Sequence, residues 1–354
     1  MSAVGNLSEW LANERTAALI TSELSLRHLC GFRLRRGLIL ATKEECFLFV
    51  SKGEFDYAEA KTEGFSVRAF SGMNQILDLL VKFNIRKILV ESDKMTVREF
   101  NYYADELHCA EIITNDLLSE KLAMMRTVKS DAELKAVEKA QSVCDRAFDK
   151  LLMNIRKGMS ERQIAAMLSG ALIELGADEI LPKFRIASGE NSAKHYCKPT
   201  DRKIGNGDFL LMDFGAKVGG YCASMARTVI VGEIMPKREN IYNAVSCAVS
   251  DGLKTLRAGI GAKVAESVAQ ATLNTWDIDK YAKADFGHGT GLEFFEPPYL
   301  ERSSPSMLKS NMTLVCGVEV TAPGRYGVKI ADSVVITEDG YVNFTTATKS
   351  LVHI

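Results

Sequence analysis

The chain has 354 residues, of which 47% are hydrophobic and 25% charged, a balance that excludes a disordered chain and predicts about two domains. Its 44 basic and 45 acidic residues give a formal net charge of −1, which gives no support to nucleic acid or an anionic membrane as a partner. No apolar stretch approaches the ~18 residues that span a bilayer, and the start MSAVGNLSEWLANERTAALI lacks the features of a secretory signal. We therefore expect a cytoplasmic protein.

Short apolar runs alternate with amphipathic stretches over residues 16–120. The runs TAALIT, GLILAT, CFLFVS and KILVES have the length of buried strands, and GMNQILDLLVKFNI has helical spacing. This alternation predicts an α/β domain with a mixed sheet. Helical spacing then continues over 119–156, with Ser130 placed as an N-cap. We place the domain boundary in this stretch, which divides the chain into residues 1–122 and 123–354.

The second part of the chain carries its helices and strands in runs. A helix is predicted from Ser160, which Gln163 can join in a capping box, to Gly176. Further helices are expected at 237–257 and 262–276. Strand-like runs lie at 208–214, 225–232, 312–320 and 328–337, separated by glycine-rich turns. Runs of each type without strict alternation predict an α+β domain.

Two of the five histidines lie among glycines and polar residues that are typical of loops around a pocket. These are His195 in SGENSAKHY and His288 in FGHGTGLEFFEPPYL. The segment GHGTG is not a phosphate loop, because it lacks the Lys-Ser/Thr pair that such a loop supplies. Both histidines are therefore candidate site residues.

Six segments in a fixed order carry a resemblance that covers almost the whole chain. They are LSLRHLCGF, MRTVKSDAELKAVEKA, SGENSAKHY, GDFLLMDFGAKVGGYCASMART, GHGTGLEFFEPPYL and GVKIADSVVITEDG. With them the chain resembles the creatinase, prolidase and aminopeptidase P family, whose second domain is the pita-bread fold. The resemblance implies a homodimer that acts on, or binds, a peptide or a small molecule.

The resemblance also implies a metal site, because the family's peptidases hold two divalent cations with two Asp, one His and two Glu. Several anionic oxygens are needed to offset two such cations, whose shared hydroxide then attacks the peptide carbonyl of an Xaa-Pro bond. On this chain two of the five positions keep their ligand, as Asp213 and His288. The other three fall on Ser224, Gly317 and Ala331. We therefore expect no tightly bound dinuclear metal.

The rest of the family's pocket matches this chain in part. The position of a substrate-orienting histidine falls on Phe295, and that of an arginine before the last glutamate falls on Lys329. The residues expected to form a ligand pocket are Asp213, Tyr221, Arg227, His288 and Phe295.

Glu319 lies two residues after Gly317, and therefore on the same face of the same expected strand, ~6.6 Å further along. A register slip or a bulge would bring its carboxylate near the lost metal position. The alternative is an ion pair with Lys329 or Arg325. We therefore keep Glu319, together with His195, as a candidate catalytic residue.

Three functions remain open from the sequence. The favoured one is a non-catalytic homologue of the Xaa-Pro peptidases that binds a peptide or a small ligand. The alternative is a metal-independent hydrolase of a small amide or amidine, for which creatinase is the family's precedent, with His195 as general acid and base. Creatinase keeps the two late glutamates, however, which here are Gly317 and Ala331. An active Xaa-Pro peptidase is the least favoured.

Overall fold

The computed structural model describes residues 3–11, 13–233, 235–283 and 285–354. The chain folds into two compact units, Met1–Arg126 and Thr127–Ile354. The boundary expected at 122/123 falls within helix α6 (Leu117–Thr127), which continues to the end of the first unit. Among the described residues, no helix is both long and apolar enough to cross a membrane.

The first unit contains a mixed six-stranded sheet in the order β4-β3-β2-β1-β5-β6. Its strands are β1 (Thr16–Ile20), β2 (Gly37–Ala41), β3 (Cys46–Val50), β4 (Ser66–Ala69), β5 (Lys87–Val90) and β6 (Glu111–Ile113). Strand β2 pairs antiparallel with β1 and β3, whereas β4, β5 and β6 pair parallel with their neighbours. The parallel pairs are connected through helices, as crossover connections require.

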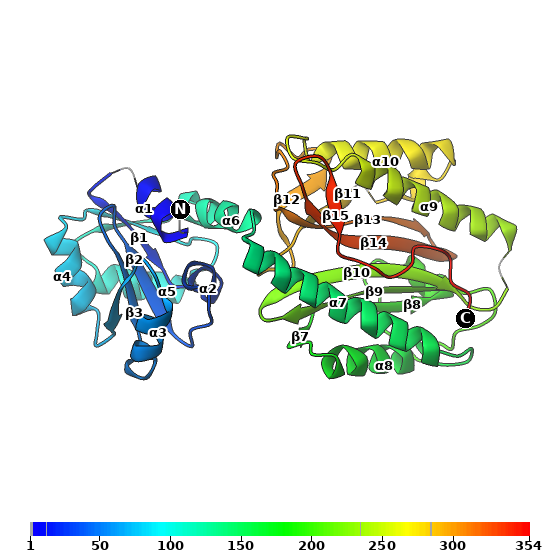
Figure 1. The fold of residues 1–354 in the computed structure, drawn as a ribbon, viewed down its shortest axis with the longest axis horizontal. Helices are drawn as coiled ribbons and strands as arrows, with labels where there is room; N and C mark the ends of the chain where they lie inside the picture. The colour runs from blue at the N-terminus through cyan, green and yellow to red at the C-terminus, as the bar shows by residue number, and fades with distance from the viewer. Residues whose placement is uncertain (1–2, 12, 234, 284) are drawn as a thin grey trace. The chain divides into compact units, whose positions relative to one another are not determined.

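Helices cover both faces of this first sheet. They are α1 (Ala3–Trp10), α2 (Glu23–Cys30), α3 (Phe55–Lys61), α4 (Asn74–Lys82), α5 (Val97–Glu106) and α6, with a 3-10 turn at Lys52–Glu54. Because side chains alternate along a strand, Ala18 and Ile20 pack with α1, α2, α3 and α6. Ala17 and Leu19 pack on the other face against α4. The first unit is therefore the α/β domain that the sequence predicts (Figure 1).

The second unit contains a nine-stranded antiparallel sheet in the order β12-β11-β13-β14-β10-β9-β7, with β15 on β14 and β8 on β9. Its strands are β7 (Glu179–Ile180), β8 (Arg185–Ser188), β9 (Phe209–Val218), β10 (Tyr221–Ile230), β11 (Asp285–Gly289), β12 (Glu296–Glu301), β13 (Thr313–Ala322), β14 (Tyr326–Ile336) and β15 (Tyr341–Asn343). The long hairpins β9–β10 and β13–β14 are joined through the pair Ala226 and Ala331.

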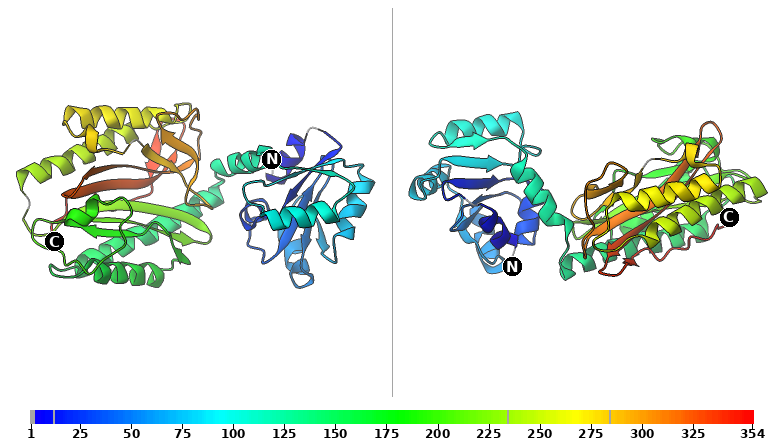
Figure 2. Two further views of the ribbon diagram at one scale, coloured as in Figure 1. Left: turned by 180° about the vertical axis from the view of Figure 1, so that it is seen from behind. Right: turned by 90° about the horizontal axis from the view of Figure 1, so that it is seen from above.

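Four long helices cover one face of this sheet, as Figures 1 and 2 show. They are α7 (Asp131–Asn154), α8 (Glu161–Glu174), α9 (Pro236–Lys254) and α10 (Lys263–Thr275), with 3-10 turns at Gly189–Ala193 and Asp279–Tyr281. The capping boxes of α7 and α8 are the ones that the sequence predicts, Ser130 with Glu133 and Ser160 with Gln163. Each box satisfies two backbone N–H groups that the helix leaves free.

The alternation along β13 separates its two faces by chemistry. Leu314, Cys316 and Val318 belong to the apolar core beneath α9 and α10. Gly317 and Glu319 point to the opposite face, because successive side chains alternate. Glu319 therefore lies with Gly317 on the sheet face that the long helices leave uncovered.

Candidate functional site

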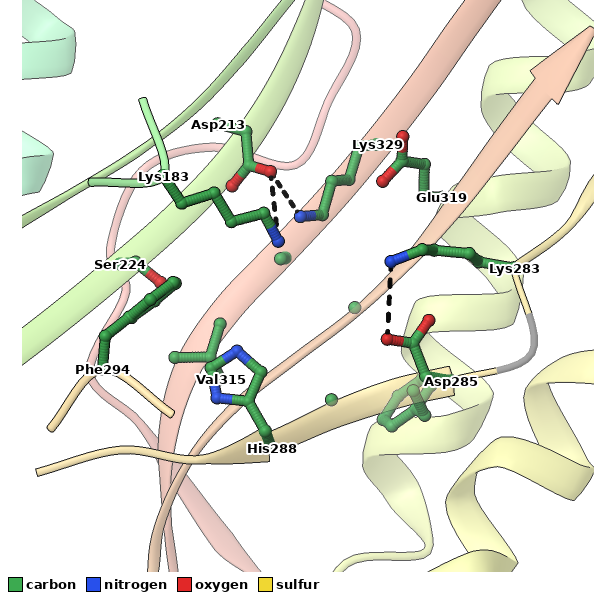
Figure 3. Close-up of a pocket in the computed structure, with 14 residues that line it drawn as sticks. Lys183, Asp213, Ser224, Lys283, Asp285, His288, Phe294, Val315, Glu319 and Lys329 are labelled. Atoms are coloured by element: carbon green, nitrogen blue, oxygen red, sulfur yellow. Dashed lines mark hydrogen bonds and ion pairs between the residues drawn. The ribbon is translucent and has the colours of Figure 1, made fainter. Parts of the chain in front are cut away.

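A pocket lies on this uncovered face, between the two hairpins (Figure 3). Its polar lining consists of Lys183, Asp213, Ser224, Lys283, Asp285, His288, Glu319 and Lys329, and its other lining residues are Phe286, Gly287, Phe294, Val315, Gly317 and Ala331. The cavity has a volume of about 40 Å³, which on the scale of water-sized sites is room for a few water molecules or one small polar group.

The innermost ion pair of the pocket joins β9 to β14. The Nζ of Lys329 donates to Oδ2 of Asp213 at 2.6 Å, and the two side chains are 12% and 5% exposed. The Nζ of Lys183 lies 3.6 Å from the same oxygen. Burial alone would raise the pKa of Asp213, but Lys329 and Lys183 outweigh it and hold that pKa below its usual value. Two ammonium groups therefore surround one buried carboxylate.

Glu319 forms the second ion pair, with an arginine from β8. Its Oε1 accepts from Nη2 of Arg185 at 2.8 Å, and both side chains are buried. Burial raises the pKa of Glu319, but the charges of Lys329 and Arg185 lower it further than burial raises it. The Oε2 of Glu319 is buried and has no hydrogen-bond partner among the described residues.

The two candidate histidines are neutral near pH 7. Burial lowers the pKa of His288 to about 4, and its Nδ1 lies 2.9 Å from the Gly289 carbonyl oxygen. Burial, followed by the charge of Lys283, also lowers the pKa of His195. The Nδ1 of His195 lies 3.9 Å from Oε1 of Glu319, beyond hydrogen-bonding distance. The imidazole is therefore close to a carboxylate that does not orient it.

The loop that carries His195 is held by one buried carboxylate, Glu161 in the first turn of α8. Glu161 accepts hydrogen bonds from the backbone N–H and hydroxyl of both Ser188 and Thr200, and from the side-chain amide of Asn191. Burial raises its pKa, but these hydrogen bonds together lower it below the usual value. Because Glu161 contacts both ends of the loop, it fixes the position of His195 without touching it.

Family comparisons agree with this two-domain fold. Residues 135–338 match the model described as metallopeptidase family M24, and residues 6–128 match the creatinase/prolidase N-terminal domain. The chain belongs to the M24 metallopeptidase family. These two matches confirm the family and the pita-bread fold that the sequence motifs predict.

Relatives and solved structures match this M24 protein along nearly their whole length. It is 28% identical over 336 residues to the uncharacterized peptidase YqhT of Bacillus subtilis, with 94% of each chain covered. It is 27% identical to the Xaa-Pro dipeptidase of Pyrococcus horikoshii, covering 96% of this chain and 95% of that one. The structure of an Xaa-Pro dipeptidase from Bacillus anthracis matches with a TM-score of 0.91 and 27% identity, covering 99% of this chain and 98% of that one.

The residues at this M24 site do not fit two divalent cations. Of the five expected ligand positions, Ser224 offers a hydroxyl, while Gly317 and Ala331 offer no polar side chain. The remaining carboxylate, Asp213, is already neutralised by the ammonium of Lys329. Among the described residues, no group of three or more His, Cys, Asp or Glu side chains is arranged to hold a metal ion. Hard cations require several free oxygen ligands, and the site supplies too few.

Glu319 does not replace the missing ligand at Gly317 by a change of register. Strands β13 and β14 keep regular pairing from Thr313 to Ala322, with Glu319 opposite Lys329 and Gly317 opposite Ala331. The slip or bulge considered from the sequence is therefore absent from this hairpin, because every residue of β13 has a single partner on β14. The carboxylate binds Arg185, a partner that the sequence analysis did not name.

Gly317 and Ala331 pack so closely that a larger residue does not fit. A Cβ built on Gly317 would lie 2.5 Å from the Cβ of Ala331 and would also clash with the Ile330 carbonyl oxygen. We expect Gly317→Ala to lower the free energy of unfolding by about 1–3 kcal/mol, as overpacking does, measured by urea denaturation. Gly170→Ala is the matched control, because α8 leaves open space there. An equally stable Gly317→Ala variant would contradict the close packing.

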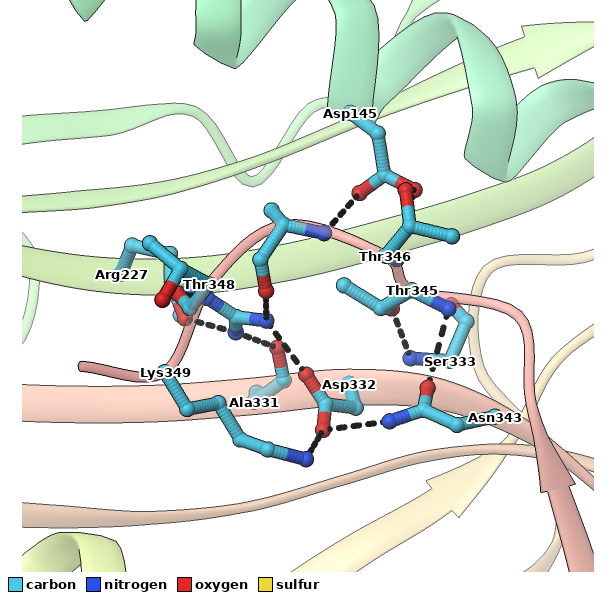
Figure 4. Close-up of polar contacts among 12 residues, drawn as sticks. Asp145, Arg227, Ala331, Asp332, Ser333, Asn343, Thr345, Thr346, Thr348 and Lys349 are labelled. Atoms are coloured by element: carbon cyan, nitrogen blue, oxygen red, sulfur yellow. Dashed lines mark hydrogen bonds and ion pairs between the residues drawn. The ribbon is translucent and has the colours of Figure 1, made fainter.

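Two of the expected pocket residues lie elsewhere, and this corrects the sequence analysis. Arg227 is on the helix-covered face of β10, because it alternates with Ala226. Its guanidinium binds Asp332 and carbonyl oxygens of the C-terminal segment (Figure 4). Tyr221 is at the start of β10, where its hydroxyl donates to Glu133 at 2.9 Å. Both residues position structural elements rather than line the pocket.

Phe295 was also expected in the pocket but is not among its lining residues; it is half exposed, and its ring lies 4.3 Å from that of His288, which does line the pocket. Its neighbour Phe294 lines the pocket and was not expected. The sequence analysis also missed Lys183, Arg185, Lys283 and Asp285. The available signal was the pair of basic residues within the otherwise apolar segment LPKFRIA, since a buried charge needs a partner.

Proposed function

We propose that this M24-family protein is a non-catalytic binding protein whose pocket holds a small ligand or one end of a peptide. The observation that carries the proposal is the 2.6 Å contact between Lys329 Nζ and Asp213 Oδ2. A side-chain ammonium thus balances the carboxylate that would otherwise bind a metal. Like charges repel strongly at a few ångströms in a partly buried site. Lys329 and Lys183 therefore repel a divalent cation. They also neutralise Asp213, so that this carboxylate needs no metal ion to balance its charge.

The names of relatives support a peptidase-like ancestry, and the residues of this chain argue against peptidase chemistry. Two of the similar proteins are called Xaa-Pro dipeptidases. Without a metal-bound hydroxide, hydrolysis needs another activated nucleophile or a general base. The thiol of Cys222 is not such a group, because burial raises its pKa to about 12.

The metal-independent hydrolase stays a second candidate because His195 is neutral and lies near Glu319. A neutral imidazole is able to accept a proton. Two observations weigh against it: the 3.9 Å separation between His195 Nδ1 and Glu319 Oε1, and the hydrogen bond that Arg185 already donates to this oxygen. A screen of proline dipeptides, guanidino compounds and small amides with chelator present tests it. Turnover that is lost in His195→Ala, with the fold intact, would establish the hydrolase.

The main test is a calorimetric titration of chelator-stripped protein with Mn²⁺, Co²⁺ and Zn²⁺. We expect less than one tight equivalent per chain and no cleavage of Xaa-Pro dipeptides in the presence of these ions, because three of the four positions expected to hold a carboxylate have none. A circular dichroism spectrum before and after stripping controls for unfolding. Tight binding of two metal ions per chain, or cleavage that depends on added metal, would overturn the proposal.

The homodimer that the family resemblance implies is part of the same proposal, as is the cytoplasmic location. Sedimentation velocity at micromolar concentration tests the dimer directly. A single species with the mass of one chain, 39.0 kDa, would contradict it.

A further inference from the structure

The pocket carries an excess of positive charge. Three lysines line it and Arg185 adjoins it, whereas the described residues around it supply three carboxylates, those of Asp213, Asp285 and Glu319. One positive charge is therefore uncompensated. A bound group with a single negative charge would balance it, whereas a dianion would exceed it.

The excess positive charge is carried by Lys183 and Lys283, whose ammonium N–H groups are available to donate hydrogen bonds to a ligand. Lys329 and Arg185 already donate to Asp213 and Glu319. The Nζ of Lys183 is 3.6 Å from its nearest carboxylate oxygen, and that of Lys283 is 3.7 Å from Oδ2 of Asp285. Both distances are too long for hydrogen bonds. The two side chains are 31% and 38% exposed, so a ligand is able to reach their ammonium groups.

Two further features of the pocket indicate the rest of the ligand. Phe294 lines the cavity, and its ring centre lies 4.4 Å from that of the half-exposed Phe295. The Nζ of Lys183 lies 5.9 Å from the centre of the Phe295 ring. Figure 3 shows Lys183 and Lys283 reaching into the cavity from opposite sides, with Phe294 at its edge. Glu319, which lines the same cavity, has a buried Oε2 that finds no hydrogen-bond partner in the part of the chain that the structure describes. A buried acceptor of this kind indicates a missing donor.

We propose that the pocket binds a monocarboxylate, with Lys183 and Lys283 holding the carboxylate and Phe294 and Phe295 contacting an apolar group. An N–H or O–H of the ligand would donate to Glu319. The volume of about 40 Å³ suits the carboxylate end of the ligand, and the apolar remainder would contact the two phenylalanine rings. This chemistry belongs equally to a free carboxylic acid and to the C-terminus of a peptide. The inference rests on the proposed function, because it requires a pocket without a metal cluster.

Calorimetry on the full chain in the presence of chelator tests the inference with two pairs of probes. Hippurate and its neutral amide, hippuramide, represent the free acid, and Ala-Ala-Phe with a free or an amidated C-terminus represents the peptide. We expect each carboxylate to bind at least tenfold more tightly than its amide, because an amide does not balance the uncompensated charge. If Ala-Ala-Phe binds more tightly than hippurate, the ligand is the C-terminus of a peptide. If hippurate binds more tightly, the ligand is a free carboxylic acid.

Variants locate the binding in this pocket. Lys183→Met with Lys283→Met should weaken carboxylate binding at least tenfold, and each single variant by a smaller factor. Neither ammonium makes a hydrogen bond within the described residues, so the fold should persist, which urea denaturation checks. Lys263→Met, at an exposed lysine of α10, should leave the affinity within twofold.

Three results would overturn the inference: equal binding of acid and amide, undiminished binding by the double variant, or no binding of either acid at millimolar concentration. Sulfate that competes as well as hippurate would also contradict it, since sulfate is a dianion and the charge balance favours a monoanion. Failure of the proposed function looks different, because it would appear as two tight metal ions in the separate titration.

Discussion

Replacing Lys329 with methionine is expected to lower the free energy of unfolding of the second unit by about 3–5 kcal/mol. The ammonium of Lys329 is the only group that the described residues place within hydrogen-bonding distance of the buried Asp213 carboxylate. Without it, the buried Asp213 would have the more distant charges of Lys183 and Arg185 to offset its own. Urea denaturation followed by the fluorescence of Trp276 measures the effect, since this tryptophan lies in the second unit.

A double variant separates the lost ion pair from lost packing. Lys329→Met combined with Asp213→Leu removes both charges, and we expect it to recover most of the lost stability, because replacing a whole buried pair with apolar residues costs little. If the free energy of unfolding of Lys329→Met alone is within about 1 kcal/mol of that of the unmodified protein, the buried charge of Asp213 does not need Lys329 to stabilise it. The central argument for an ammonium in place of a metal would then fail.

Replacing Arg227 with methionine is expected to have an effect of similar size, about 3–5 kcal/mol. Its guanidinium donates to Asp332 at 2.7 Å and to four backbone carbonyl oxygens, those of Ala226, Ala331, Ala347 and Thr348. These contacts attach the C-terminal segment to β14 and β10. Arg227→Lys is the conservative control, which keeps the charge but loses the planar fork of donors. We expect it to recover only part of the stability.

The effect of Arg227→Met should depend on pH in a predictable direction. Burial raises the pKa of Asp332, but Arg227 and then Lys349 outweigh it, so the pKa in the folded protein is lowered. A lowered pKa contributes stability above the unfolded value, ~3.9, which is lost as the pH falls below it. The variant loses this contribution, so its deficit should keep its full size from pH 7 down to about 4 and shrink only as the pH falls below about 4. A deficit that stays constant below about pH 4 would show that Asp332 does not interact with Arg227 as an ion.

The sequence by itself determined much of the local structure and the family. Alternation and helical spacing located the main strands and helices, because these periods follow from the backbone. The capping boxes at Ser130 and Ser160 formed as expected, since each depends on residues only three positions apart. The family motifs identified the pita-bread fold and placed Asp213 and His288 in the pocket. The hypothesis that three metal-ligand positions fall on Ser224, Gly317 and Ala331 also came from the sequence alone.

Only the tertiary structure decided how the remaining charges are paired. Asp213 and Lys329 are 116 residues apart, and Arg185 and Glu319 are 134 apart. Their contacts depend on strand order and register, which a period of two does not specify. Strand register also explains why the prediction for Arg227 was wrong. Its motif matches that of the family's pocket, but its side chain lies on the face of β10 opposite the pocket. Sequence motifs identify which residues belong to a site, while the sheet determines which face they occupy and which partner each charge meets.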